Sequence, residues 1–248
     1  MTPALLIHSG GFTSRQWRKL RDRLAPRRVV APDLLGYGDR RWPAGEPFHF
    51  QQDVDMLAAV LAEIGAPAHL VGHSYGGLLA LQLALARPDQ VRSIAVYEPV
   101  AFGVLEAPED DEALASLGAL PAYVPDDAGV DEAWLAAFVD WWNGAGAWAR
   151  LPADTQQAFR EVSWKLSREV ISLATDTTSR GRYGTITAPT LVLAGDATQR
   201  AELRVVERLA AALPHATRRL MPGLGHMGPI THAGIVNDAI AAHLDAHD

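Results

Sequence analysis

Short apolar runs alternate with segments that are apolar on one side only along the first hundred residues. Runs bounded by turn residues favour buried strands, and segments that are apolar every three or four positions favour amphipathic helices. The predicted strands cover residues 3–7, 28–31, 68–71 and 91–97, and the predicted helices cover 15–24, 50–64 and the stretch behind residue 74. This alternation predicts an α/β fold with a parallel sheet and right-handed crossovers.

The pattern changes near residue 101. Residues 102–185 contain no run typical of a strand, and their spacing predicts helices near 109–120, near 131–143 and between 152 and 175. Strand patterns return at 190–194 and 218–221, and helical patterns follow at 202–213 and 233–244. We therefore expect one core domain made of residues 1–101 and 186–248, with a helical cap inserted at 102–185.

Composition narrows the class of protein. The chain has 248 residues, of which 48% are hydrophobic, enough for one domain with a large core. Its net charge is −7 and it has no basic stripe, so nucleic acid is not an expected partner. It has no cysteine, which excludes disulfides and a thiol nucleophile. Without a long apolar run or the features of a secretion signal, we expect a cytoplasmic protein that does not bind a membrane.

The sequence around Ser74 carries the clearest chemical signal. Residues 72–76 read Gly-His-Ser-Tyr-Gly, directly after an apolar strand pattern and before an Ala- and Leu-rich helical one. This context is what a nucleophile elbow requires, because the sharp turn exposes the serine hydroxyl above the sheet. A side chain at Gly72 or Gly76 would crowd the neighbouring strand and helix. The pattern predicts that Ser74 is a nucleophile.

A serine nucleophile needs a base, and the base needs an acid that orients it. In an open α/β sheet such groups gather at the carboxyl ends of the strands. His226 follows the last predicted strand in a glycine-rich loop, and we expect it to be the base. Two acids also follow strands, Glu98 and Asp196. Both precede His226 in the sequence, so chain order does not separate them.

An oxyanion hole needs two N–H donors. We expect one to be the amide of Tyr75, directly after the nucleophile. The other should come from the glycine-containing loop after the first strand, where Gly10 is the first choice and Gly11 the next.

Taken together, these motifs resemble those of the α/β-hydrolase fold over nearly the whole chain. The resemblance rests on His-Ser-Gly-Gly at 8–11, Asp-Leu-Leu-Gly-Tyr-Gly at 33–38, Gly-His-Ser-Tyr-Gly-Gly at 72–77, the strand at 190–194, and Gly-Leu-Gly-His at 223–226. It implies a Ser–His–acid triad and a cap that shapes the substrate pocket. We expect no metal and no other cofactor, because no metal-ligand spacing or dinucleotide fingerprint is visible in the sequence.

Three departures from the family pattern matter. The chain opens at the strand before the oxyanion loop, so we expect about six strands, all parallel, without the two strands that usually lead. Ser9 stands where the family usually has glycine. The usual position of the acid, three residues after the glycine that ends strand 190–194, is occupied by Thr198. Some family members place the acid after the strand that follows the nucleophile helix, which favours Glu98 over Asp196.

Five of the seven tryptophans lie in the predicted cap, and Trp141 and Trp142 are candidates for the wall of a substrate pocket. Neighbouring helical positions point about 100° apart, so the two rings need not face the same way.

The sequence predicts a serine hydrolase that cleaves a small to medium carboxylic ester, thioester or lactone through an acyl-enzyme. The same triad could cleave a C–C bond of a diketone or carry out perhydrolysis, and a weakly catalytic module that binds a small ligand is a further alternative. The expected partner is a small-molecule substrate, and the expected state is a monomer or homodimer.

Overall fold

The computed structural model describes residues 1–42, 46–120 and 131–248. The predicted cap at 102–185 therefore includes ten residues, 121–130, that lie outside the described part. The predicted strands and helices of the remainder can be compared with the structure directly.

Six parallel strands form one sheet in the order β2-β1-β3-β4-β5-β6. They are β1 (Ala4–Ile7), β2 (Val29–Val30), β3 (Ala68–His73), β4 (Val91–Tyr97), β5 (Thr190–Gly195) and β6 (Ala216–Met221). The number of strands and their direction confirm the predicted fold class. The strand predicted at 28–31 is shorter in the structure, where β2 has only two residues and pairs with β1.

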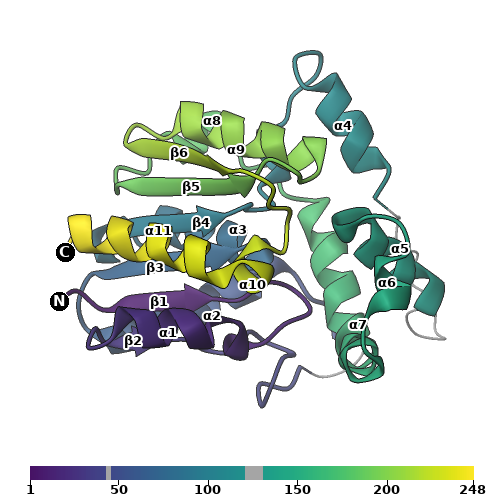
Figure 1. The fold of residues 1–248 in the computed structure, drawn as a ribbon. Coiled ribbons are helices and arrows are strands. Elements are labelled where there is room, and N and C mark those ends of the chain that lie inside the picture. Colours follow the sequence, from purple (N-terminus) through teal and green to yellow (C-terminus); the bar gives the residue numbers. More distant parts are fainter. Residues whose placement is uncertain (43–45, 121–130) are drawn as a thin grey trace.

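Helices cover both faces of the sheet (Figure 1). The α-helices are α1 (Arg18–Leu24), α2 (Phe50–Ile64), α3 (Tyr75–Ala86), α4 (Asp111–Gly118), α5 (Glu132–Asn143), α6 (Ala147–Arg150), α7 (Ala153–Leu173), α8 (Arg180–Tyr183), α9 (Arg200–Ala212), α10 (Gly228–Thr231) and α11 (Ala233–Ala246). Short 3₁₀ helices are η1 (Ser14–Trp17), η2 (Pro88–Gln90) and η3 (Phe102–Val104). The helices α1 and α11 pack on one face of the sheet, and α2, α3 and α9 pack on the other.

Burial explains why the helices differ in composition. α2 has an apolar stripe that includes Val54, Leu57 and Leu61, and it ends at Gly65, whose φ of 76° suits glycine. α3 is apolar nearly all round because it lies between the sheet and other helices, with Leu78 and Leu83 fully buried. The composition of each helix thus matches its position: α2 is amphipathic at the surface, and α3 is apolar because it is buried.

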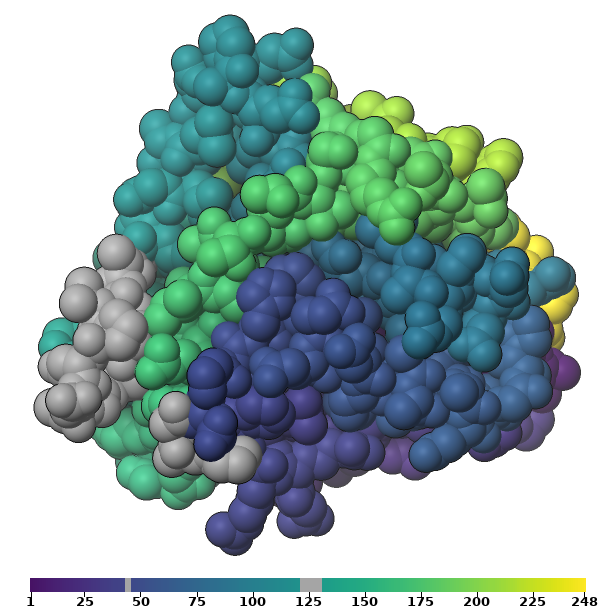
Figure 2. Space-filling model, turned by 180° about the vertical axis from the view of Figure 1, so that it is seen from behind, coloured from purple at the N-terminus to yellow at the C-terminus, as the bar shows by residue number. Residues whose placement is uncertain are grey.

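Three helices of the predicted cap, α5, α6 and α7, lie together beyond one end of the sheet (Figure 1). They share an apolar cluster that includes Trp134, Trp148 and Phe159. Seen from behind, the surface of α7 meets the residues that lead into α2 (Figure 2), and there the Ser172 hydroxyl accepts from the Phe50 amide at 2.8 Å. In the described residues, no helix is both long and apolar enough to cross a membrane.

Candidate active site

Ser74 lies in the sharp turn between β3 and α3. Its backbone has φ 55° and ψ −119°. Residues other than glycine rarely adopt this conformation, and those that do are often found at functional sites. The turn is tightly enclosed: a Cβ on Gly72 would overlap the Gly76 carbonyl, and a Cβ on Gly76 would overlap the Ile7 carbonyl. The two glycines therefore let strand, turn and helix approach closely enough to hold the serine in this position.

Ser74, His226 and Glu98 form one chain of hydrogen bonds. His226 Nε2 is 2.9 Å from Ser74 Oγ, and Nδ1 is 2.7 Å from Glu98 Oε2. All three are buried, with side-chain exposures of only 4% for His226 and 0% for Glu98. A carboxylate can only accept a hydrogen bond, so Nδ1 carries the proton and Nε2 is left to accept one from the serine hydroxyl.

Glu98 is held rigidly at the end of β4. Its backbone is also in the left-handed region, with φ 44°. Oε1 accepts from the Gly195 amide at 2.9 Å, and Oε2 accepts from the Thr198 hydroxyl at 2.7 Å. Thr198 stands where the family's usual acid would be, and here it donates to an acid that comes from the neighbouring strand.

The structure does not bring Asp196 to His226. Its carboxylate accepts from the Gly223 amide at 2.7 Å in an exposed turn. Of the two acids that the sequence left open, Glu98 is the one that contacts the imidazole.

Three side chains position the loop that carries His226. The His73 ring donates from Nε2 to the His226 carbonyl at 2.8 Å, and Tyr97 donates its hydroxyl to the Gly225 carbonyl at 2.8 Å. Burial, reinforced by His226, lowers the pKa of His73 well below its usual value, so this histidine stays neutral. Trp142 stacks on the His226 ring, with centroids 3.8 Å apart and planes 22° apart. Sequence reasoning missed these roles of His73 and Tyr97, although each lies beside a candidate triad residue.

Gly10 and Tyr75 both line the site, and neither backbone amide has a hydrogen-bond acceptor among the described residues. The amides on either side of Gly10 are occupied. Ser9 donates to the Gln16 side chain at 3.0 Å, and Gly11 donates to the Tyr37 hydroxyl at 2.9 Å. Of the two glycines considered, Gly10 is therefore the one whose N–H is available.

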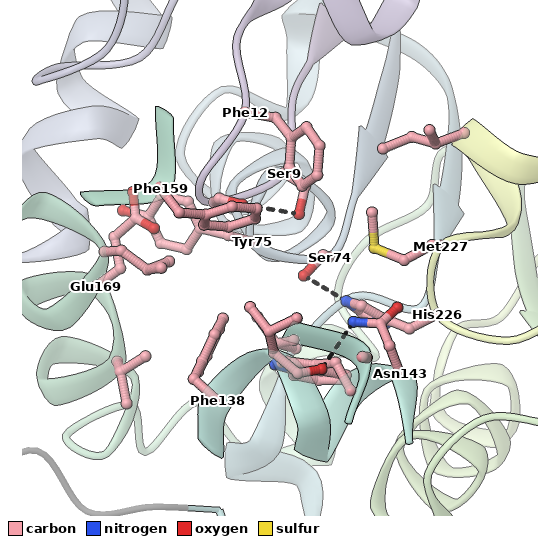
Figure 3. Close-up of a pocket in the computed structure, with 18 of the residues that line it drawn as sticks. Ser9, Phe12, Ser74, Tyr75, Phe138, Asn143, Phe159, Glu169, His226 and Met227 are labelled. Atoms are coloured by element: carbon pink, nitrogen blue, oxygen red, sulfur yellow. Dashed lines mark hydrogen bonds between the residues drawn. The ribbon is translucent and has the colours of Figure 1, made fainter. Parts of the chain in front are cut away.

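A cavity of about 330 Å³ opens above Ser74 and is bounded by both the core and α5 to α7. Figure 3 shows Ser74 and His226 on one side of it and Phe159 and Glu169 on the opposite side. Most of its lining is apolar and includes Phe12, Phe138, Trp142, Phe159, Leu166 and Met227. No Lys or Arg is found among the described residues that line it.

The two candidate tryptophans differ in position. Trp142 is part of the cavity wall, whereas Trp141 is not, because its ring packs edge-on against Trp142 and against the core. The prediction that both line the pocket is therefore matched by the geometry for Trp142 only. In the described part of the chain, no three His, Asp or Glu side chains are grouped as metal ligands.

Comparison with known proteins shows the family of the chain. Residues 4–239 match the family described as the alpha/beta hydrolase family. Over 191 residues the chain is 32% identical to the lipase LipV of Mycobacterium tuberculosis, a match that covers 76% of this chain and 63% of LipV. It is 42% identical over 106 residues to a pimeloyl-[acyl-carrier protein] methyl ester esterase of Neisseria meningitidis, covering 42% of this chain and 39% of the esterase. The matches thus span less than two thirds of these relatives.

Among solved structures, MenH from S. aureus superposes with a TM-score of 0.77 at 19% identity, covering 99% of this chain and 94% of MenH. This similarity extends over the sheet and the helices beyond it. From the sheet order, the turn at Ser74 and the family match, the chain belongs to the alpha/beta hydrolase family.

Proposed function

We propose that this protein is a serine hydrolase that cleaves uncharged carboxylic esters through an acyl-enzyme. The observation that carries the proposal is the unbroken chain from Ser74 through His226 to Glu98, with bonds of 2.9 and 2.7 Å. A serine hydroxyl is a weak nucleophile by itself, and this arrangement supplies both the base and the group that orients it.

In the first half of the reaction, Ser74 Oγ attacks the ester carbonyl carbon and its proton moves to His226 Nε2. Glu98 accepts the Nδ1–H throughout and stabilises the imidazolium cation. The amides of Gly10 and Tyr75 donate to the oxygen that becomes negative. When the intermediate collapses, the C–O bond to the alcohol breaks and His226 returns the proton to the departing oxygen.

In the second half, water replaces the alcohol. His226 takes a proton from the water, whose oxygen attacks the acyl carbon, and the same two amides bind the second oxyanion. Collapse breaks the bond to Ser74, which recovers its proton from His226, and the carboxylic acid leaves. The cycle needs no metal and no redox cofactor.

The cavity supports an uncharged, largely apolar substrate. Its described lining has no Lys or Arg to pair with an anionic group, and its aromatic wall suits a hydrocarbon acyl or alcohol part. Two relatives named a lipase and a methyl ester esterase support an ester bond as the target.

The test is a panel of short- and medium-chain esters, thioesters and lactones, measured alongside a vinylogous diketone and a peroxide assay. We expect turnover of uncharged esters, and Ser74→Ala should lower kcat/KM by a factor of about 10³ or more. Cleavage of the diketone without ester turnover would replace this proposal with C–C hydrolysis. Ligand binding without any turnover, unchanged in Ser74→Ala, would favour a binding module.

A further inference from the structure

Three ionisable side chains are buried where α7 crosses α2, outside the triad. Lys165 Nζ lies 3.0 Å from Asp53 Oδ2 and 2.6 Å from Glu169 Oε1. Their side chains are 0–2% exposed. The ammonium also lies over the Phe48 ring, 3.9 Å from its centroid. Buried charges of this kind are costly unless they are paired and hydrogen-bonded, so the details of the pairing matter.

The same cluster contacts both sides of the proposed oxyanion hole. Tyr75, whose amide is one donor, donates its hydroxyl to Asp53 Oδ2 at 2.8 Å. On the other side Glu169 Oε2 is packed so closely against Gly10 that a Cβ there would overlap it. The Tyr37 hydroxyl, which accepts from the Gly11 amide at 2.9 Å, also interacts with the Glu169 carboxyl. Both amide donors are thus held by residues attached to this cluster.

The cluster contains two carboxyls and one ammonium, so it carries a net negative charge unless one carboxyl is protonated. The other titratable groups around it do not compensate. Burial raises the pKa of Tyr37 and of Tyr75 well above the usual value, and both stay neutral. Burial lowers the pKa of His8, at the end of β1, to about 4, so it is also neutral at pH 7. The remaining charged neighbour of that loop, Asp33, is itself an acid.

Hydrogen bonding indicates which carboxyl takes the proton. Asp53 accepts from Lys165, from the Tyr75 hydroxyl and, through Oδ1, from the Leu35 amide at 2.9 Å. Glu169 accepts from Lys165, but its Oε2 has no donor at ordinary hydrogen-bond distance in the described part of the chain. Because bonds to the charged form favour ionisation, the carboxyl with fewer of them, Glu169, takes the proton. In agreement, burial raises the pKa of Glu169 to about 7, against the opposing effects of Lys165 and of the Tyr37 hydroxyl.

We propose that Glu169 is a positioning residue of the oxyanion hole that must be protonated for catalysis, so that its ionisation sets an alkaline limit to activity. The inference rests on the proposed function. A neutral Glu169 leaves the cluster uncharged beside Gly10. An ionised Glu169 gives the cluster a net negative charge next to the amide that should bind a developing oxyanion, and like charges in a site of low dielectric repel strongly.

The experiment measures kcat/KM for an uncharged ester between about pH 6 and about pH 9.5. The wild-type profile should fall at least fivefold between about pH 7 and about pH 9. Glu169→Gln keeps the shape and can still accept from Lys165 but cannot ionise, so its profile should stay flat to the alkaline end. The matched control is Glu161→Gln, an exposed glutamate on the same helix, which should reproduce the wild-type profile.

Circular dichroism at each pH and labelling of Ser74 by a fluorophosphonate at pH 7 accompany the profiles, so that unfolding is recognised. A wild-type profile without an alkaline fall, or a fall that persists in Glu169→Gln, would overturn the role of Glu169 while leaving the hydrolase intact. Absence of both labelling and turnover at every pH in folded protein would instead refute the proposed function. If Glu169→Gln is unfolded, Glu169→Met is measured in the same way, with the same two outcomes.

Discussion

Ser74 and Glu98 are the two non-glycine residues with positive φ in the described part of the chain. A backbone in this region costs energy and persists only where the surroundings enforce it. Ser74 is enforced by the close approach of β3 and α3, and Glu98 by bonds from Gly195 and Thr198. Both residues belong to the proposed triad. The fold therefore tolerates a strained backbone at the two positions where it orients these side chains.

The first prediction concerns the acid. Glu98→Gln should lower kcat by a factor of about 10³ to 10⁴, because the amide can no longer fix the imidazole tautomer or stabilise its cation. Asp196→Asn is the control and should change kcat less than about threefold, since this residue only holds a turn. Steady-state kinetics on one ester measures kcat for both variants. If kcat falls as far in Asp196→Asn as in Glu98→Gln, Glu98 is not the triad acid.

The second prediction concerns Glu202, a fully buried carboxyl on α9 with no hydrogen-bond partner among the described residues. Burial, reinforced by the charge of Glu98, raises its pKa well above the usual value. The folded protein therefore holds this proton at pH values where the unfolded chain, with a pKa of about 4.3, has lost it. By linkage, this group lowers the free energy of unfolding as pH rises from the unfolded pKa to the folded one.

Glu202→Gln removes this ionisation without changing the shape of the side chain. Urea unfolding should show a gain in stability over wild type at about pH 8 that shrinks at about pH 5. A difference between the two proteins that stays constant with pH would show that Glu202 is not held in its protonated form.

At the scale of elements, the hydrophobic pattern predicted most of the fold because the inner strands and the longer helices have the burial that their patterns imply. The helix predicted at 50–64 is α2 with the same bounds, and the strand predicted at 91–97 is β4. The pattern overestimated β2, which covers only Val29–Val30 of the strand predicted at 28–31.

The sequence could not choose between Glu98 and Asp196 because both directly follow strands. The choice depends on the turn after each strand. The Glu98 carboxylate is hydrogen-bonded to His226, whereas the Asp196 carboxylate accepts from the Gly223 amide. Residue types alone do not predict this turn geometry. Only the resemblance to the family favoured Glu98.

The third prediction tests how closely α3 approaches the sheet. Gly76→Ala should lower the free energy of unfolding by about 2 kcal/mol or more, since its Cβ would overlap backbone carbonyls that cannot move aside. Gly234→Ala, in α11 with open space around it, should instead stabilise by up to about 1 kcal/mol. Urea denaturation measures both, and an unchanged stability for Gly76→Ala would refute the close approach.

At the scale of the whole molecule, the site is formed where α5 to α7 meet the core. Trp142 on α5 stacks on His226, and Lys165 on α7 pairs with Asp53 on α2. The sequence predicted a cap and its helices, but contacts between side chains 112 positions apart depend on how the helices pack. The ion cluster beside the proposed oxyanion hole was therefore not foreseeable from local patterns.

The fourth prediction follows from this packing. Trp142→Leu should lower kcat/KM about tenfold, because the stacked ring orients the imidazole and attracts its cation. Trp141→Leu, the adjacent residue outside the cavity, should lower it less than about threefold. If the two variants lose activity equally under conditions where both are folded, the stacking does not assist catalysis.

The central claim is that Ser74 is an activated nucleophile. Labelling by a fluorophosphonate, read by intact mass and peptide mapping, tests it without knowledge of the natural substrate. We expect one phosphonyl adduct, on Ser74. It should be absent in Ser74→Ala and form far more slowly in His226→Ala. A folded protein that forms no adduct, or forms one at another residue, would contradict it.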